Sequence, residues 1–256
     1  MSQSGPTIVS DGAAPTACVL LIGNELLSGK TQDANLQFLG RELAGLGIRL
    51  GECRVVRDDH DAIIAHLNEC RARYTYVFTT GGIGPTHDDI TAEAVAAAFG
   101  VPLVVDAEAK RRLEAYGREL NEARLKMARV PEGASLIDNP ISHAPGFRMD
   151  NVFVLAGIPS IARAMFSAAA AELRHGAAIH SASVDVWLRE GDFAAVLERI
   201  AAAHADVEIG SYPFARDGRF GANLVVRGTD ADIVEAVLAR ITAEMDALGG
   251  EPERRT

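Results

Sequence analysis

The chain has 256 residues, of which 48% are hydrophobic and 23% are charged, and its formal net charge is −10. This composition is typical of a soluble globular protein with room for one large or two modest domains. A strongly acidic chain lacks the basic face that binds a phosphate backbone, so the charge argues against a nucleic-acid partner. No stretch reaches the roughly 20 apolar residues of a membrane-spanning helix, and we expect a cytoplasmic protein without a membrane partner.

Residues 1–15 are expected to form a flexible leader, because they lack the basic segment and the apolar run of a signal peptide. Cys18, Cys53 and Cys70 are an odd number of cysteines without a C-x-x-C pair, so they predict neither a disulfide framework nor a zinc knuckle. All three fall on apolar faces of predicted elements, and we interpret them as core residues.

Between residues 16 and 175 the sequence alternates between buried strands and amphipathic helices. The predicted strands are 16–23, 48–56, 74–80 and 151–157. A polar loop is expected after the first strand. Two helices are predicted to begin at Asp33 and at Asp58–Asp59, and further helices are predicted over 91–99, 107–128 and 160–173. Such alternation predicts a parallel sheet with right-handed crossovers.

The pattern changes near residues 175–179. Strands are predicted over 184–188, 207–214 and 220–228, with helices around Phe193–Ile200 and over 230–247. This β-α-β-β-α order predicts a small α+β domain of the split βαβ kind, covering residues 179–250.

The segment after the first strand reads GNELLSGKT (23–31), which is close to a phosphate-binding P-loop. In a P-loop four residues separate the two glycines, whereas five residues separate Gly23 from Gly29 here. The backbone N–H groups close around a phosphate only at the right loop length, so we reject an ordinary nucleotide triphosphatase.

A glycine-rich loop, TTGGIGPTHDDIT (79–91), joins a buried strand to a helix. Adjacent glycines let the main chain approach a ligand, and N–H groups at a helix N-terminus favour an anion. Asp88 and Asp89 either cap that helix or hold a metal ion or a hydroxyl group. An acidic chain can accept an anion if a divalent metal, backbone N–H groups or a local basic patch offset the charge, and residues 106–130 carry seven Lys/Arg against five acids.

These motifs resemble the molybdopterin-binding (MoaB/Mog-type) domain family, and most closely the N-terminal domain of competence/damage-inducible protein A (CinA). The resemblance covers about residues 16–175 and rests on GNELLSG (23–29) with Asp33 and Asn35, RVVRDD (54–59), TTGGIGPTHDDIT (79–91), RLKMARVPEGA (124–134), APGF (144–147) and GIPS (157–160). It implies a three-layer α/β sandwich with a mainly parallel sheet and a ligand at the carboxyl ends of the strands. Residues 179–250 resemble, more weakly, the region that follows this fold in eukaryotic FAD synthases.

The resemblance also implies a set of site residues. Asp58 and Asp89 are expected to be catalytic, and Asp58, Asp88 and Asp89 to hold a divalent metal such as Mg, Mn or Co. A small phosphorylated pterin or nucleotide is expected to contact Gly23, Asn24, Glu25, Lys30, Thr80, Gly81, Gly82, Gly84, Pro85, Thr86, Gly157, Pro159 and Ser160. His87 lies in the same loop and is a further candidate contact. Family membership implies a homo-oligomer, either a dimer or a trimer.

Two functions stay open at this stage. The first is metal-dependent hydrolysis of a nucleotide diphosphate such as ADP-ribose or FAD, and the second is a non-catalytic or adenylylating role in molybdenum-cofactor metabolism. Two departures from the family pattern argue against catalysis. Asn24 offers no carboxylate, and the segment AGIPSI (156–161) stands where the family often has Pro-Gly-x-Pro followed by Glu. A third hypothesis, a DNA-associated factor, conflicts with the acidic charge.

Overall fold

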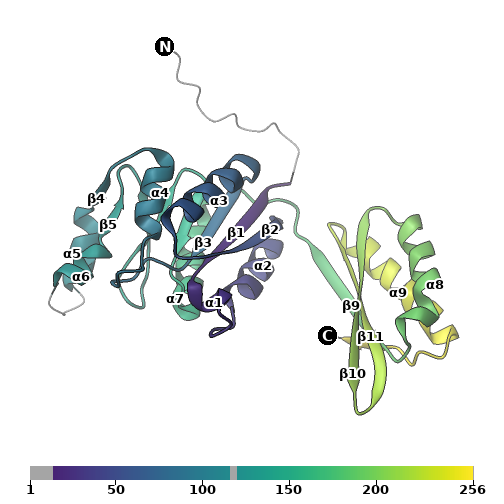
Figure 1. Ribbon diagram of the computed structural model, residues 1–256. Coiled ribbons are helices and arrows are strands. Elements are labelled where there is room, and N and C mark those ends of the chain that lie inside the picture. Colours follow the sequence, from purple (N-terminus) through teal and green to yellow (C-terminus); the bar gives the residue numbers. More distant parts are fainter. Residues whose placement is uncertain (1–13, 116–119, 256) are drawn as a thin grey trace. The chain divides into compact units, whose positions relative to one another are not determined.

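The computed structural model describes residues 14–115 and 120–255. Its contacts divide the chain into two compact units, with the division between Gly176 and Ala177, and each is described by itself (Figure 1). Residues 1–13 of the expected leader, and Arg118 of the basic segment, lie outside the described residues. Within the described ranges, the helices are too short or too polar to cross a membrane.

A six-stranded sheet in the order β2-β1-β3-β8-β7-β6 forms the centre of the first unit. Its strands are β1 (Thr16–Ile22), β2 (Arg49–Val56), β3 (Tyr76–Thr80), β6 (Ser135–Ile137), β7 (Gly146–Met149) and β8 (Val152–Leu155). The pairs β1–β2, β1–β3 and β3–β8 are parallel, whereas β7 and β6 continue the sheet in antiparallel fashion. The mainly parallel sheet predicted from the sequence is confirmed.

Helices cover both faces of this sheet (Figure 1). The helices of the first unit are α1 (Asn24–Leu27), α2 (Asn35–Gly45), α3 (His60–Arg73), α4 (Thr91–Phe99), α5 (Ala107–Ala115), α6 (Glu122–Lys126) and α7 (Pro159–Ala169), followed by the short 3-10 helix η1 (Ala170–Glu172). One core contains side chains of α2 and α7, and the other contains side chains of α3 and α4. The first unit is therefore a three-layer sandwich.

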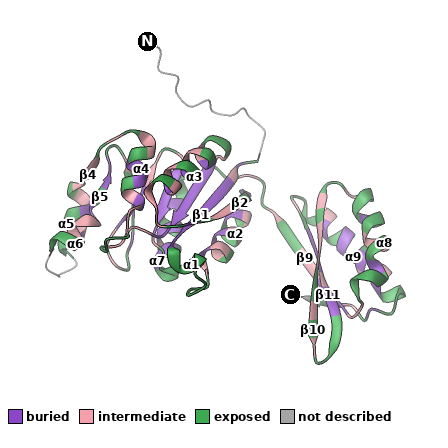
Figure 2. Cartoon of the chain, viewed as in Figure 1, coloured by how far each residue is buried: buried purple, intermediate pink, exposed green. Residues whose placement is uncertain are grey.

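Strand β1 shows how the sequence produces these layers. Its residues after Thr16 are all buried, and their side chains alternate between the two cores. Val19 and Leu21 pack under α2 and α7, whereas Cys18 and Leu20 pack under α3 and α4. A continuous apolar run is what a strand buried on both faces requires, and Figure 2 shows this strand buried over most of its length.

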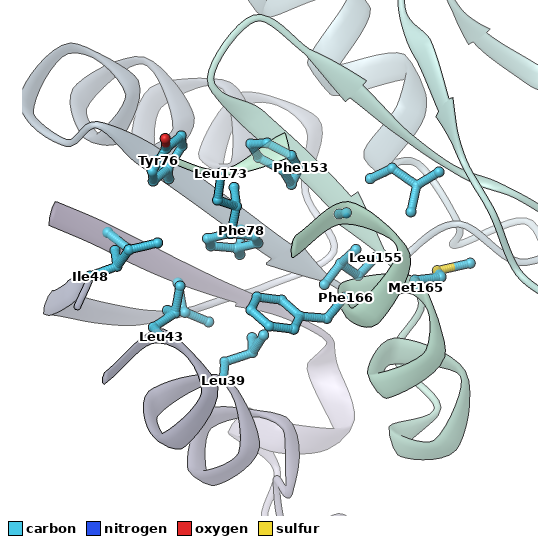
Figure 3. Packing of buried hydrophobic residues seen from close by; sticks show 14 of the residues in the cluster. Leu39, Leu43, Ile48, Tyr76, Phe78, Phe153, Leu155, Met165, Phe166 and Leu173 are labelled. Carbon is cyan, nitrogen blue, oxygen red and sulfur yellow. The ribbon is translucent and has the colours of Figure 1, made fainter. Parts of the chain in front are cut away.

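The core beneath α2 and α7 is rich in aromatic rings. The Phe166 ring from α7 lies 5.5 Å from that of Phe78 on β3, and Phe78 stacks on Phe153 of β8 at 5.1 Å (Figure 3). Leu39 and Leu43 of α2 complete the contact. Each fully buried side chain of this size contributes about 1.5–3 kcal/mol to burial free energy, so these residues fix the helices against the sheet that carries the site.

Several elements differ from the sequence-based expectation. The expected polar loop after β1 contains the four-residue helix α1, and α2 begins at Asn35 although Asp33 still accepts a hydrogen bond from the Leu36 N–H. The small sheet of β4 (Leu103–Val105) and β5 (Arg129–Pro131), and strands β6 and β7, were not predicted. These strands have three or four residues, which is too short to show a period of two. Cys53 is only half-buried, unlike Cys18 and Cys70.

The second unit is a four-stranded sheet in the order β10-β11-β9-β12, with two helices. Its elements are β9 (His180–Val186), α8 (Glu190–Ala203), β10 (Val207–Arg216), β11 (Arg219–Gly228), α9 (Ala231–Ala247) and β12 (Glu253–Arg255). Both β9 and β10 run antiparallel to β11, which lies between them. They are therefore parallel to each other, as the predicted split βαβ arrangement requires. The edge strand β12 was not predicted, and β9 begins four residues earlier than expected.

Candidate functional site

Four parallel strands end at one edge of the main sheet, and the loop after each strand contributes to one cavity. Asp58 follows β2, Gly23 follows β1, the segment Gly81–Asp89 follows β3, and Ala156–Ile158 follows β8. The cavity has a volume of about 570 Å³, within the usual range for small-molecule sites. Open α/β sheets bind ligands outside the carboxyl ends of their strands, so this cavity is the candidate site.

The conformation of the glycine loop requires glycine at two positions, Gly81 and Gly82, because a side chain at either one would clash. Gly81 has φ +102°, and a Cβ there would lie 2.2 Å from the carbonyl oxygen of Ile22. Gly82 has φ +67°, and a Cβ there would lie 2.2 Å from the Thr91 hydroxyl. That hydroxyl donates to the Gly81 carbonyl at 2.9 Å, which ties the loop to the first turn of α4. The loop is thus held close against β1.

Three consecutive N–H groups of this loop are available to a ligand. The Gly81 N–H donates to the Leu155 carbonyl at 3.2 Å, but those of Gly82, Ile83 and Gly84 donate to no acceptor among the described residues. All three residues line the cavity. Unpaired N–H groups on successive residues form a concavity that suits a phosphate or carboxylate oxygen.

Asp58 is held by the loop after β1 and does not cap α3. Its Oδ2 accepts from the Asn24 N–H at 2.8 Å, and the Asn24 Oδ1 accepts in return from the Asp58 N–H at 3.4 Å. The capping role belongs to Asp59, whose Oδ1 accepts from the Ala62 N–H at 2.9 Å. The carboxylate of Asp58 therefore lies at the cavity, held by the Asn24 N–H, and the Asn24 side chain accepts from the Asp58 backbone.

Asp89 organises the far end of the glycine loop. Its Oδ2 accepts from the N–H of Thr86 at 2.8 Å and from the Thr86 hydroxyl at 2.5 Å. The ammonium group of Lys126, from α6, donates to the Thr86 carbonyl at 2.5 Å. Beside them, the Thr86 hydroxyl and the backbone N–H of Asp88 lower the pKa of the exposed Asp88 carboxyl, which keeps it ionised.

Lys126 belongs to the basic segment (residues 106–130) and contacts this loop through the Thr86 carbonyl. Lys110, Arg111 and Arg112 form ion pairs with acids on their own helix, and Arg112 also pairs with Asp138. The cavity itself carries the carboxylates of Glu25, Asp58, Asp88 and Asp89. An excess of negative charge lines the site, so a polyanionic ligand needs a cation to bind there.

The carboxylates of the cavity do not form a complete metal cage. Across the described parts of the chain, the one group of three potential metal ligands within 4.8 Å of one another is elsewhere, at Cys18, Glu52 and Cys70. The Oδ1 atoms of Asp58 and Asp89 make no hydrogen bond among the described residues. Mg²⁺ is commonly held by one or two carboxylates together with substrate phosphates and water, so Asp58 and Asp89 are the residues that could each offer it a free oxygen.

Most of the predicted site residues come together at the cavity. Those that line it are Gly23, Glu25, Asp58, Gly81, Gly82, Gly84, Pro85, Thr86, Asp88, Asp89, Gly157 and Pro159. Four predicted site residues do not line the cavity, namely Asn24, Lys30, Thr80 and Ser160. The further candidate His87 does not line it either. Thr80 is buried at the end of β3, and Lys30 is exposed in the turn after α1.

The sequence did not single out one wall of the cavity. Asn139, Ser142 and Ala144, from the loop between β6 and β7, line it together with Met127. Asn139 is buried, and its side chain bonds to Ser142, to the Ala144 carbonyl and to the Ile141 N–H. This loop was missed because the two strands that bracket it were not recognised.

Comparison with known proteins shows the family to which the chain belongs. A model of the family described as "Probable molybdopterin binding domain" matches residues 18–175. The chain belongs to this family. Its second unit is similar to the "FAD synthase, middle domain", which matches residues 178–249.

Two relatives of this molybdopterin-binding-domain protein show what it is similar to over most of its length. It is 33% identical to a "CinA-like protein" of Synechococcus sp. (strain RCC307), over 91% of this chain and 59% of that protein. It is 32% identical to a "Probable FAD synthase" of Caenorhabditis elegans, over 92% of this chain and 50% of that protein. The chain thus spans between half and three fifths of the length of these two relatives. The predicted resemblance to CinA is confirmed.

A solved structure supports the fold. The first unit of the molybdopterin-binding-domain protein is similar to CinA from Thermoplasma acidophilum, described as a protein of unknown function, with 34% sequence identity and a TM-score of 0.59. The match covers 62% of this chain and 98% of that one.

Proposed function

We propose that this protein is a metal-dependent hydrolase of a nucleotide diphosphate such as ADP-ribose or FAD. The observation that carries the proposal is one cavity lined both by the unpaired N–H groups of Gly82–Gly84 and by the carboxylates of Asp58 and Asp89. The first group suits the oxygens of a diphosphate, and the second suits the cation that such a ligand needs. The relative named as a probable FAD synthase makes FAD one of the dinucleotides to test.

Each part of the site has a defined task in this reaction. Gly82, Ile83 and Gly84 bind one phosphoryl group through their N–H groups, and Lys126 keeps the loop in place through the Thr86 carbonyl. Asp58 and Asp89 would hold the divalent ion through their Oδ1 atoms. When bound, such an ion neutralises the diphosphate and activates a water molecule. Water adds to phosphorus, the bond to the bridging oxygen breaks, and AMP leaves with a second phosphomonoester.

The test is AMP release from ADP-ribose and from FAD in the presence of Mg²⁺, Mn²⁺ or Co²⁺. We expect Asp89→Asn to abolish release while far-UV circular dichroism stays unchanged. Asp61→Asn is the matched control, because the Asp61 side chain is 98% exposed at the start of α3, and this variant should retain activity. Failure to release AMP from either dinucleotide with all three metals would refute the proposal.

A second candidate is a non-catalytic or adenylylating pterin or nucleotide binder in molybdenum-cofactor metabolism. It is supported by the lack of a carboxylate in residues 156–161 (AGIPSI), because the pattern of the resembled family, Pro-Gly-x-Pro, is often followed by Glu. A binder should show saturable heat on calorimetric titration with a pterin phosphate in the presence of EDTA. Binding without metal, combined with no AMP release, would favour this function over hydrolysis.

A further inference from the structure

A second cluster of reactive side chains lies outside the cavity, between the sheet and α3. Cys18 on β1 is the direct neighbour of Glu52 on β2 in the parallel ladder, and Cys70 from α3 lies above them. The two Sγ atoms are 3.2 Å apart, and a carboxylate oxygen of Glu52 completes a group whose ligand atoms all lie within 4.8 Å of one another. None of the three residues lines the cavity.

The surroundings of this cluster hold its members in place. Arg54 Nε donates to Glu52 Oε1 at 2.7 Å, and the Tyr74 hydroxyl donates to Glu52 Oε2 at 2.8 Å. Metal-binding carboxylates are commonly oriented by such outer hydrogen bonds. Both thiols are buried, whereas the Glu52 side chain is 28% exposed. Glu52 therefore marks the side from which an ion would enter.

We propose that Cys18, Cys70 and Glu52 form a binding site for a thiophilic divalent cation such as Zn²⁺. Two thiolates and the carboxylates of Glu52 and Glu69 carry four negative charges, which a divalent ion and the guanidinium groups of Arg54 and Arg73 balance. Thiolate sulfur is the donor that distinguishes Zn²⁺ sites from those of Mg²⁺. This ion would be distinct from the one proposed for the cavity, where the donors are oxygen atoms.

The distance between the two sulfur atoms is compatible with this site. Zinc–sulfur bonds of about 2.3 Å in a tetrahedral site place two sulfurs about 3.8 Å apart, which small side-chain rotations achieve from 3.2 Å. Three protein ligands leave the fourth position for water.

The experiment is a Co²⁺ titration of the full chain, reduced and stripped of metal beforehand. We expect a sulfur-to-cobalt charge-transfer band that saturates at one equivalent and is displaced by Zn²⁺. The band should vanish in Cys70→Ser and in Cys18→Ser, and Glu52→Gln should weaken Co²⁺ binding about tenfold or more. Cys53→Ser is the matched control, because Cys53 is the third cysteine and lies outside the cluster; it should keep the band.

Absence of the band in the unsubstituted protein overturns the proposal, whatever the folding of the serine variants. A band that survives in Cys70→Ser also overturns it, because the ion then binds elsewhere. Counting free thiols in protein purified without reductant tests the competing reading. A count of one in place of three would show that Cys18 and Cys70 form a disulfide, and would likewise overturn the metal site.

Discussion

The side-chain amide of Asn35 joins the first turn of α2 to the loop after β8, because its Nδ2 donates to the Gly157 carbonyl at 2.8 Å. Asn35 is 3% exposed, and its Oδ1 has no partner among the described residues. Gly157 in turn lies against Gly81, where a Cβ on Gly157 would come within 3.3 Å of the Gly81 Cα. One buried amide thus fixes the wall of the cavity against the glycine loop.

Asn35→Asp should destabilise the first unit by about 1–3 kcal/mol, because the donor is replaced by an oxygen that faces the Gly157 carbonyl in a buried site. Urea unfolding followed by circular dichroism measures this loss. Gln37→Glu makes the same chemical change at an exposed position of α2 and should have little effect. Equal stability of the two variants would show that the Asn35–Gly157 bond is unimportant.

Gly82→Ala should remove ligand binding and lower stability. The added methyl group meets the Thr91 hydroxyl, and the positive φ of residue 82 disfavours any side chain, at a cost of roughly 1–2 kcal/mol for the backbone alone. Calorimetry with a nucleotide diphosphate and thermal unfolding measure the two effects. Gly45→Ala is the control, since a Cβ there meets nothing within 4 Å at the end of α2. A Gly82→Ala protein that binds normally would contradict the proposed phosphate cradle.

Asp58→Asn should reduce AMP release by two or more orders of magnitude with little loss of stability. Asparagine keeps an oxygen that can accept from the Asn24 N–H, so the structural bond survives in neutral form at a cost of about 1 kcal/mol. The negative charge is lost, and with it the attraction for a divalent ion. Activity assays at several metal concentrations test this prediction. Unchanged turnover would mean that Asp58 has only the structural role.

The stabilising effect of Glu52 should depend on pH in a defined direction. The hydrogen bond from Arg54, and to a smaller extent the one from Tyr74, lower the pKa of Glu52 below its ordinary value of about 4.5. A carboxyl whose pKa is lowered in the folded state stabilises the fold at pH values above its ordinary pKa. This contribution disappears as the pH falls through the pKa of the folded state. In the presence of EDTA, the stability difference between the wild-type protein and Glu52→Gln should therefore be present at pH 7 and shrink below pH 4.5. A constant difference across this range would contradict the assignment.

Patterns within the sequence were enough to predict the parallel strands of the main sheet, the longer helices and the glycine loop. The buried run at 16–22 and the alternation of strands with amphipathic helices each follow from local periodicity. The glycines of the loop after β3 were found for the same reason, because a strand followed by adjacent glycines and a helix is a local signal. The short strands β4 to β7 gave no such signal, and the cavity wall at Asn139 was missed with them.

The sequence by itself determined which segments are buried and which loops follow strands, since burial and turn preferences are properties of neighbouring residues. Only the tertiary structure decided which distant groups meet. Asp58 bonds to a residue 34 positions away, and the thiols of Cys18 and Cys70 are 52 positions apart in the chain. Such pairs arise when strand order and helix packing bring remote segments together, and no periodicity within one segment encodes them.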